Sequence, residues 1–262
     1  MAESTSIKVL SANCQGLRTI EKRVDVLSYF KETGASIVCL QDTHLLPKDT
    51  ASIKDIWPDC YLHGIKTNSR GVAILLNNNF DYTVSKCQKD KNGNYMQLLL
   101  TCNSMKINLI TIYAPNQDDP KFFEEIKNLA NNDDSDYVII CGDFNLVIDP
   151  QKDCKNYVNL NNPKARSIVL DTINDLDLID IYRTLNPNTK RYTWRKKNPL
   201  KQARLDLFLI SNSMSDLIST SAIRSGYRSD HSIVELDISL HNFKLGRGIW
   251  KLNNSLLKIK II

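Results

Sequence analysis

The sequence has no long hydrophobic segment. Its longest aliphatic runs, such as residues 72–76, have the length of a β-strand, whereas a membrane-spanning helix needs about 20 apolar residues. Residues 1–8 are mostly polar, and no apolar stretch typical of a secretory signal follows them. We therefore expect a soluble protein that has no membrane partner.

The sequence also lacks the spacing of a cysteine-based zinc site. It has seven cysteines, an odd number, and none of them forms a Cys-x-x-Cys pair. Cys39 and Cys141 lie inside apolar runs that are typical of buried strands. We interpret the cysteines as reduced thiols that fill the core of an intracellular protein, which favours a nuclear and cytoplasmic location.

Acidic residues are missing from two segments, 190–204 and 241–262. These segments hold twelve of the lysines and arginines, so a net charge of +5 for the whole chain leaves −7 for the rest. Local basic patches are expected in proteins that bind a polyanion. A basic segment can also be an ordinary solvated loop, so charge alone does not identify a nucleic-acid-binding protein.

Short apolar runs rich in Ile, Val and Leu recur along the chain and predict β-strands. The predicted strands cover residues 7–12, 36–40, 71–76, 95–101, 106–113, 137–141, 204–210 and 232–237. Helical patterns lie between them, one with Ile20, Val24 and Leu27 on one face, and two that begin at Asp119-Pro120 and Asn162-Pro163. Strands that alternate with helices, together with neighbouring strands at 95–113, favour a mixed α/β sandwich.

The length of 262 residues and a hydrophobic content of 42% suit one domain with a sizeable core. We expect this domain to cover residues 1–240. The remaining residues, 241–262, are basic and contain glycine, and are expected to form an extension or linker.

Polar residues stand at the ends of several predicted strands. They are Asn13, Asp42, Asp143 with Asn145, and Asp230 with His231, while Asp206 lies within an apolar strand. Carboxylates rarely enter apolar surroundings unless they are paired or bind a metal. If these strand ends share one edge of a sandwich, the site contains four carboxylates, two amides and an imidazole.

This set of side chains suits the hydrolysis of a phosphodiester. Carboxylate and amide oxygens are ligands that Mg²⁺ prefers, an Asp can deprotonate water, and a protonated His can donate to phosphate oxygens. The sequence has no Gly-x-Ser-x-Gly motif and no Cys–His arrangement that would indicate a covalent nucleophile. Each motif alone could be a structural turn, and their joint occurrence is what favours a catalytic site.

These motifs resemble those of the endonuclease/exonuclease/phosphatase superfamily, which includes DNase I and the apurinic/apyrimidinic endonucleases. The resemblance rests on Ser11-Ala12-Asn13-Cys14-Gln15-Gly16-Leu17, Leu40-Gln41-Asp42-Thr43-His44, Ile112-Tyr113-Ala114-Pro115-Asn116, Gly142-Asp143-Phe144-Asn145, Arg204-Leu205-Asp206 and Ser229-Asp230-His231. It implies a DNase I-like fold, a four-layered α/β/β/α sandwich with two mixed β-sheets.

A closer resemblance is to the endonuclease domain of LINE-type non-LTR retrotransposon polyproteins. It rests on residues 177–187, Tyr192-Thr193-Trp194 and 248–257. It implies that the chain is an N-terminal fragment, monomeric as an isolated domain, whose extension leads toward a missing reverse transcriptase. The partner would be double-stranded target DNA, and the product a nick whose 3′-hydroxyl primes reverse transcription.

The resemblance implies a role for each site residue. Asn13 and Asp42 would hold Mg²⁺, with Mn²⁺ as the alternative, and Asp230 would lie beside the metal and the phosphate. Asp143 would activate water, while Asn145 and Tyr113 would position the phosphate. His231, oriented by Asp206, would stabilise the transition state.

Asp42 departs from the family pattern, which has Glu at this position. Asp is one methylene shorter, so a bridging water could replace direct coordination. We therefore predict nicking weaker than that of a Glu-bearing relative.

The basic segment 190–204 is interpreted as a hairpin with Arg195, Lys196 and Lys197 near its tip. Together with Thr193 and Lys201, these residues are predicted to contact DNA and to select it by shape. The alternative is a flexible exposed loop.

Two other functions stay open. One is a phosphatase or sphingomyelinase-like phospholipase of the same superfamily. The other is a catalytically weakened nucleic-acid-binding module in which Asp42 is the lesion.

Overall fold

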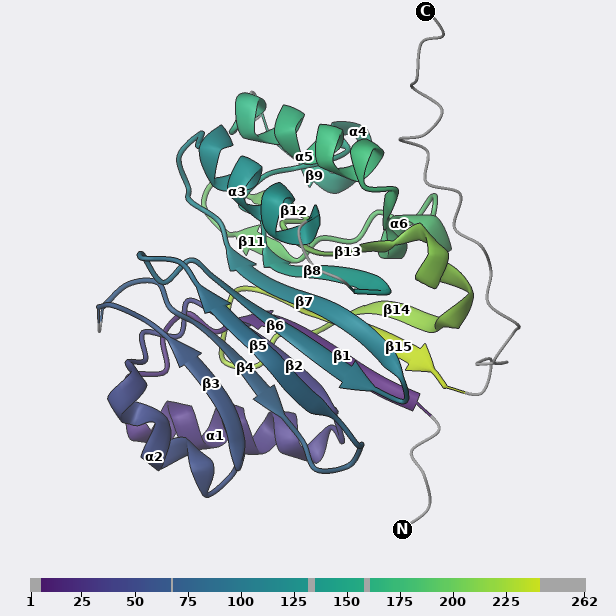
Figure 1. The fold of residues 1–262 in the computed structure, drawn as a ribbon. Helices are drawn as coiled ribbons and strands as arrows, with labels where there is room; N and C mark the ends of the chain where they lie inside the picture. Colours follow the sequence, from purple (N-terminus) through teal and green to yellow (C-terminus); the bar gives the residue numbers. More distant parts are fainter. Residues whose placement is uncertain (1–5, 67, 132–134, 158–160, 241–262) are drawn as a thin grey trace, which may run out of the picture.

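The computed structural model describes residues 6–66, 68–131, 135–157 and 161–240. The predicted basic extension, 241–262, lies outside the described residues. Two six-stranded mixed sheets pack face to face, with helices on their outer faces (Figure 1). The predicted four-layered α/β/β/α sandwich is therefore confirmed.

The first sheet has the strand order β14-β15-β1-β2-β4-β3. Its strands are β1 (Ser6–Asn13), β2 (Ile37–Gln41), β3 (Asp59–His63), β4 (Val72–Leu76), β14 (Ile218–Arg224) and β15 (Ile233–Ser239). Strands β1 and β2 run parallel, and their carboxyl ends meet at Asn13 and Gln41. Strand β15 lies antiparallel to β1, so its amino end reaches the same edge.

The second sheet has the order β10-β13-β8-β7-β6-β5. Its strands are β5 (Thr83–Lys89), β6 (Tyr95–Cys102), β7 (Met105–Tyr113), β8 (Tyr137–Asp143), β10 (Leu178–Asp180) and β13 (Asp206–Ser211). Tyr113 ends β7 opposite Asp143 at the end of the parallel β8, and Asp206 begins β13 opposite Asp143. The polar residues predicted at strand ends therefore gather at one edge of the sandwich.

A smaller third sheet has the order β11-β12-β9. Its strands are β9 (Cys154–Lys155), β11 (Trp194–Lys196) and β12 (Lys201–Ala203). The helices are α1 (Ile20–Glu32), α2 (Ala51–Lys54), α3 (Pro120–Asn131), α4 (Pro150–Asp153), α5 (Pro163–Asp175) and α6 (Ile181–Leu185), with 3-10 helices at Pro47–Thr50 and Asn212–Leu217.

Three apolar clusters hold the layers together. The largest lies between the two sheets and includes Val9, Ile74, Leu109 and Phe208. A second packs α1 and α2 against the first sheet, and a third packs α3 and α5 against the second sheet. Each sheet is apolar on both faces for this reason, which explains why its central strands have continuous hydrophobic sequences.

The eight predicted strands are all present, within a few residues of their predicted bounds. Strands β3, β5 and β14 were missed because they contain many polar or exposed residues, as edge strands often do. For α3, the inward face of Phe122, Ile126 and Leu129 is confirmed, since all three are buried.

The face predicted for the first helix is only partly right. Leu27 is buried as predicted, but Ile20 and Val24 are 73% and 42% exposed, and the buried side of α1 has Arg23, Val26 and Phe30 in their place. Arg23 tolerates burial because its guanidinium donates to the carbonyls of Leu17 and Arg18 and to Ser52. A search for apolar residues alone could not find this face.

All seven cysteines are free thiols, and Cys14, Cys39, Cys102 and Cys141 are buried. Cys87 is exposed, so it does not fill the core as predicted. Among the residues that the structure describes, no helix is both long and apolar enough to cross a membrane.

Candidate active site

A cavity of about 260 Å³ opens where the two sheets meet at their polar edge. Seven of the predicted site residues line it: Asn13, Asp42, Tyr113, Asp143, Asn145, Asp230 and His231. The eighth, Asp206, lies directly behind His231. The structure thus brings together all the residues predicted to be catalytic or to hold the metal.

Asp143 lies at the centre of this group. Its Oδ2 accepts a hydrogen bond of 2.9 Å from the amide Nδ2 of Asn13, and its Oδ1 accepts one of 2.9 Å from the backbone N–H of Asn145. Asn13 and Asp143 belong to different sheets, so the first bond joins the two halves of the sandwich inside the site. Both bonds hold the carboxylate in one orientation.

The Asp143 carboxyl is in an environment that opposes its negative charge. Burial and the neighbouring Asp206 carboxylate raise the pKa of Asp143 to about 7, against the lowering effects of His231 and Asn13. One oxygen of Asp206, Oδ1, is buried without a hydrogen-bond partner among the described residues. The site therefore has an excess of buried negative charge that a cation would relieve.

His231 is held beside these carboxylates. Its Nδ1 lies 2.9 Å from Asp206 Oδ2, and its Nε2 lies 3.9 Å from both Asp143 Oδ2 and Asp230 Oδ1. Burial would lower the pKa of His231, but Asp206 and Asp143 outweigh it and raise the pKa to about 10. The imidazole is therefore a cation at neutral pH, with Nε2 directed toward the cavity.

Asn145 adopts a left-handed backbone conformation, with a φ of 50°. Its Nδ2 donates to the Ala114 carbonyl at 2.7 Å, and its own carbonyl accepts bonds from the side-chain amides of Asn161 and Asn162. These two asparagines were missed in the sequence. Their position before α5 was the only available signal, and it indicated a helix start rather than a contact with the site.

Tyr113 is half-buried at the rim of the cavity. Burial and the carboxylates of Asp42 and Asp143 raise the pKa of its phenol well above the usual range. The hydroxyl therefore stays protonated and can donate a hydrogen bond.

The Asp42 carboxylate lines the cavity but already has partners. Its Oδ1 lies 3.0 Å from His44 Nε2 and accepts a bond of 3.1 Å from the backbone N–H of Arg70. Asp42 also has a left-handed backbone, with a φ of 51°. A direct bond from Asp42 to a cation in the cavity must use the oxygen that remains.

The donor set fits a divalent cation. Asp143, Asp206 and His231 offer ligand atoms within 4.8 Å of one another, a spacing that could hold a metal ion. Because the protonated His231 donates a hydrogen bond from Nδ1 to Asp206 and has no free nitrogen lone pair, the oxygens of Asn13, Asp42 and Asp230, which line the same cavity, are the candidate ligands. These are hard oxygen donors around a surplus of negative charge.

The basic segment forms the predicted hairpin. Strands β11 and β12 pair Arg195 with Gln202 and Lys196 with Lys201, and the turn between them contains Lys197. Arg195, Lys196 and Lys197 are exposed, whereas the ammonium of Lys201 lies 5.7 Å from the Tyr157 ring centre. Tyr157 and Trp194 line the cavity, so the hairpin adjoins it.

Thr193 does not fit its predicted contact with DNA. Its side chain is fully buried, and its Oγ1 accepts hydrogen bonds from the backbone N–H groups of Leu205 and Asp206. Its carbonyl accepts the N–H of Ser232. Thr193 therefore fixes the segments that carry Asp206 and His231, and the hairpin begins from this anchored point.

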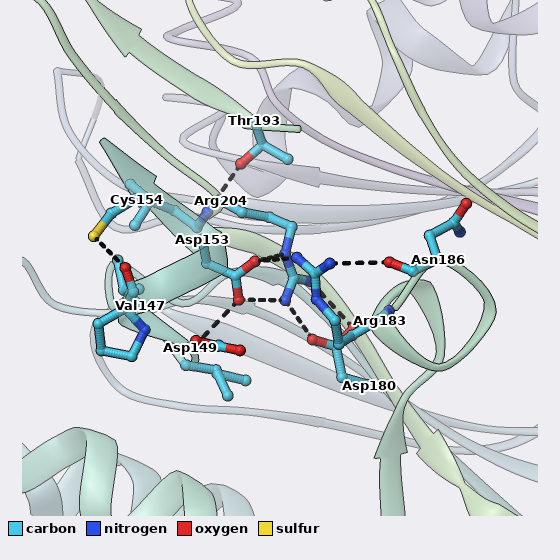
Figure 2. A network of polar contacts seen from close by, with 12 residues as sticks. Val147, Asp149, Asp153, Cys154, Asp180, Arg183, Asn186, Thr193 and Arg204 are labelled. Carbon is cyan, nitrogen blue, oxygen red and sulfur yellow. Dashed lines mark hydrogen bonds and ion pairs between the residues drawn. The ribbon is translucent and has the colours of Figure 1, made fainter. Parts of the chain in front are cut away.

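Arg204, counted in the basic segment, is likewise buried and does not face solvent. Its guanidinium makes two bonds to Asp153, of 2.8 and 2.7 Å, and also contacts Asp180. Arg183 donates to the same Asp153 carboxylate (Figure 2). This network joins α4, α6 and Arg204, two residues before β13, and so supports the strand that begins with Asp206.

Comparisons with known proteins show what this chain is similar to. The chain is 28% identical to the transposon TX1 uncharacterized 149 kDa protein of Xenopus laevis over 97% of its own length, and spans a fifth of that protein. It is 27% identical to an exodeoxyribonuclease of Bacillus subtilis, covering 89% of this chain and all of that one.

Solved structures of similar fold include the AP endonuclease LMAP from Leishmania major, with a TM-score of 0.72 and 17% identity over 90% of this chain and 88% of that one. The 3′ phosphatase NExo from Neisseria, bound to product DNA hairpin, has a TM-score of 0.71 and 19% identity over 89% and 99%. The profile of the Endonuclease/Exonuclease/phosphatase family matches residues 10–231. The chain therefore belongs to this family of hydrolytic enzymes.

Proposed function

We propose that the protein is a divalent-metal-dependent DNA endonuclease, which nicks one strand by water attack on a phosphodiester and leaves a 3′-hydroxyl. The observation that carries this proposal is the buried Asp143, held by Asn13 and Asn145 and facing an imidazolium at His231. A fixed carboxylate and a fixed cation beside one open cavity are what hydrolysis of a phosphodiester requires.

In this proposal Asp143 takes a proton from the attacking water. Burial and the Asp206 carboxylate raise the pKa of Asp143 above its ordinary value, which makes the carboxylate a stronger base. The oxygen of the water forms a bond to phosphorus, the bond from phosphorus to the 3′ oxygen breaks, and that oxygen leaves and takes a proton from solvent water to become the 3′-hydroxyl.

The other residues act on the phosphate. His231 donates from Nε2 to a phosphate oxygen, and Asp206 keeps its ring charged and oriented. Tyr113 and Asn145 position the phosphate, while Asn13, Asp42 and Asp230 hold Mg²⁺, or Mn²⁺ as the alternative. A bound divalent cation supplies neutralisation of the negative charge that grows on the phosphate oxygens.

The hairpin is proposed to grip the DNA through Arg195, Lys196, Lys197 and Lys201. Shortening residues 195–201 should change which sites are nicked, because the tip would no longer enter the groove, while the catalytic residues stay in place. Mapping nick positions on one plasmid tests this. Identical cleavage patterns for the parent and the shortened variant would reject it.

The similarity to the transposon protein supports a further step, in which the nick primes reverse transcription by a longer polyprotein. In that setting the target is double-stranded DNA, the domain acts as a monomer, and the site of action is the nucleus or cytoplasm. A primer-extension assay on nicked DNA with the longer protein tests the step, and the absence of extension from the nick would refute it.

A supercoiled-plasmid assay tests the main proposal. Nicking is expected with Mg²⁺, and should be abolished both by EDTA and by His231→Ala. Asp171→Asn, an exposed change on α5, is the control that should nick normally.

The assay also separates the competing functions. DNA binding without nicking would support a weakened binding module. The observation that favours this module is that Asp42 Oδ1 already contacts His44 Nε2 and the Arg70 N–H. Release of phosphate from phosphomonoesters without nicking would support a phosphatase instead.

A further inference from the structure

A second cavity, of about 500 Å³, adjoins the catalytic one. Asp42, Tyr113 and Asn116 line both, so these three residues form the wall between them. We call the second one the Arg70 cavity, because Arg70 is the arginine on its lining; His44, Asn68, Asn94 and Gln117 also line it. Its lining offers a cation and several amides.

The Arg70 guanidinium is held in place while its charge stays available. Its Nη1 donates to Asn94 Oδ1 at 3.1 Å, and Asn94 in turn donates to the Tyr113 carbonyl at 3.0 Å. Within the described residues, Arg70 makes no ion pair with a carboxylate, whereas Arg183, Arg204 and Arg224 each do. Such an arginine can still bind a phosphate through its remaining donors.

The backbone around Arg70 is unusual and well anchored. Asp42, His44 and Arg70 all have left-handed conformations, with φ of 51°, 58° and 63°. The Arg70 N–H donates to Asp42 Oδ1, and the His44 N–H donates to the Arg70 carbonyl. Sparsely populated conformations in residues other than glycine cluster at binding and catalytic sites.

Hydrogen bonds to the Asp90 side chain fix the loop that carries Asn94. The buried Asp90 carboxylate accepts the N–H groups of Asn92, Gly93 and Asn94, and lies 2.8 Å from His63 Nε2. Asn94 is therefore a rigid support for the Arg70 guanidinium, so little side-chain freedom is lost when a ligand binds.

We propose that the Arg70 cavity binds the DNA strand next to the scissile phosphate, with the neighbouring phosphodiester against the Arg70 guanidinium. This rests on the proposed function, because it places the scissile phosphate in the catalytic cavity. The hairpin side of that cavity is formed by Tyr157 and Trp194, and neither lines the Arg70 cavity. A strand held by the hairpin crosses the catalytic residues before it reaches Arg70, so two basic contacts flank the nick.

The test measures DNA binding without chemistry, by fluorescence anisotropy of a labelled duplex in EDTA over a range of salt concentrations. Arg70→Gln should bind about tenfold more weakly at low salt, and the slope of log affinity against log salt should fall by about one phosphate contact. Lys54→Gln removes one exposed charge from α2 and is the matched control, expected to bind like the parent. Arg70→Lys should restore the salt slope but not the full affinity.

A duplex with one neutral methylphosphonate, moved along the strand, then locates the contact. In the parent, neutralising the phosphate next to the nick should weaken binding, and in Arg70→Gln the same replacement should have no effect. Equal losses in both proteins at every position would overturn the proposal, as would parental affinity and salt slope in Arg70→Gln. If the parent binds DNA in this way but never nicks with Mg²⁺, the proposed function fails and the Arg70 contact stands.

Discussion

Asp143, the last residue of strand β8, and Asp153, the last residue of helix α4, are both buried, yet their surroundings act on their negative charges in opposite ways. Around Asp153, burial raises the pKa, but Arg204 and Arg183 outweigh it and lower the pKa below the usual value. Around Asp143, burial and Asp206 raise the pKa to about 7. The first carboxylate is compensated by protein cations, whereas the second has an excess of negative neighbours.

This difference distinguishes a carboxylate that stabilises the fold, Asp153, from one that can take part in a reaction, Asp143. A buried acid with a bidentate arginine is stable as an ion and holds elements together, and losing its partner is costly. A buried acid without enough positive charge is ready to take a proton or to attract a metal, which is why perturbed groups are frequent at active sites. One protein therefore uses the same side chain for two purposes, through its neighbours alone.

The largest expected effect comes from removing the charge at Asp143. Asp143→Asn should lower nicking by about three orders of magnitude, because the general base is lost, and should leave stability equal or higher, because a poorly compensated charge is removed. Plasmid nicking and thermal unfolding measure the two effects. Nicking within a few-fold of the parent would contradict the role of Asp143, and Asp171→Asn is the control.

The corresponding change at the other carboxylate, Asp153→Asn, should affect stability more than nicking. It leaves the Arg204 and Arg183 guanidinium groups without their shared carboxylate, so it and Arg204→Met should each destabilise the fold by about 3–5 kcal/mol. Urea unfolding measures this. Arg204→Lys should not rescue stability, since an ammonium cannot form both bonds to Asp153. Unchanged unfolding midpoints would show that the network contributes little.

The pH dependence of stability should also differ between the two regions. Because the pKa of Asp153 is lowered from 3.8, its contribution is present above that pH and disappears as pH falls through the folded value. Because the pKa of His231 is raised from 6.5 to about 10, its contribution is complete below 6.5 and disappears as pH rises through 10.

Unfolding free energies measured across pH therefore sharpen the comparison. The difference between the parent and Arg204→Met should shrink in acid, and the difference between the parent and His231→Gln should shrink in alkali. Differences that stay constant with pH would mean that neither pair contributes through its charge.

The smallest expected effect is at Asp42. Asp42→Glu should raise nicking or metal affinity by less than about tenfold, because the longer side chain reaches the cavity while its oxygen can still meet His44 and the Arg70 N–H. Metal titration of nicking is the measurement. If Asp42→Glu and Asp42→Ala both match the parent, Asp42 is not a ligand.

Much of the site could be predicted because its signals are local. An apolar strand followed by a polar residue identifies Asn13, Asp42 and Asp143, and parallel strands bring such ends to one edge. The same local reasoning failed for Thr193 and Arg204, which lie in a polar, basic stretch but are buried. Their burial depends on the N–H groups of Leu205 and Asp206 in one case and on Asp153 in the other, and neither contact leaves a pattern in the sequence.

The sequence by itself determined the residue types of the site, the positions of the main strands along the chain and the presence of the basic hairpin. Each of these depends on neighbours along the chain. Only the tertiary structure decided how the charges combine. The bond from Asn13 to Asp143 spans 130 positions, and the one from His231 to Asp206 spans 25. The pKa of a buried carboxyl depends on such distant partners and on the loss of water around it, so the fold determines which aspartate is structural and which is reactive.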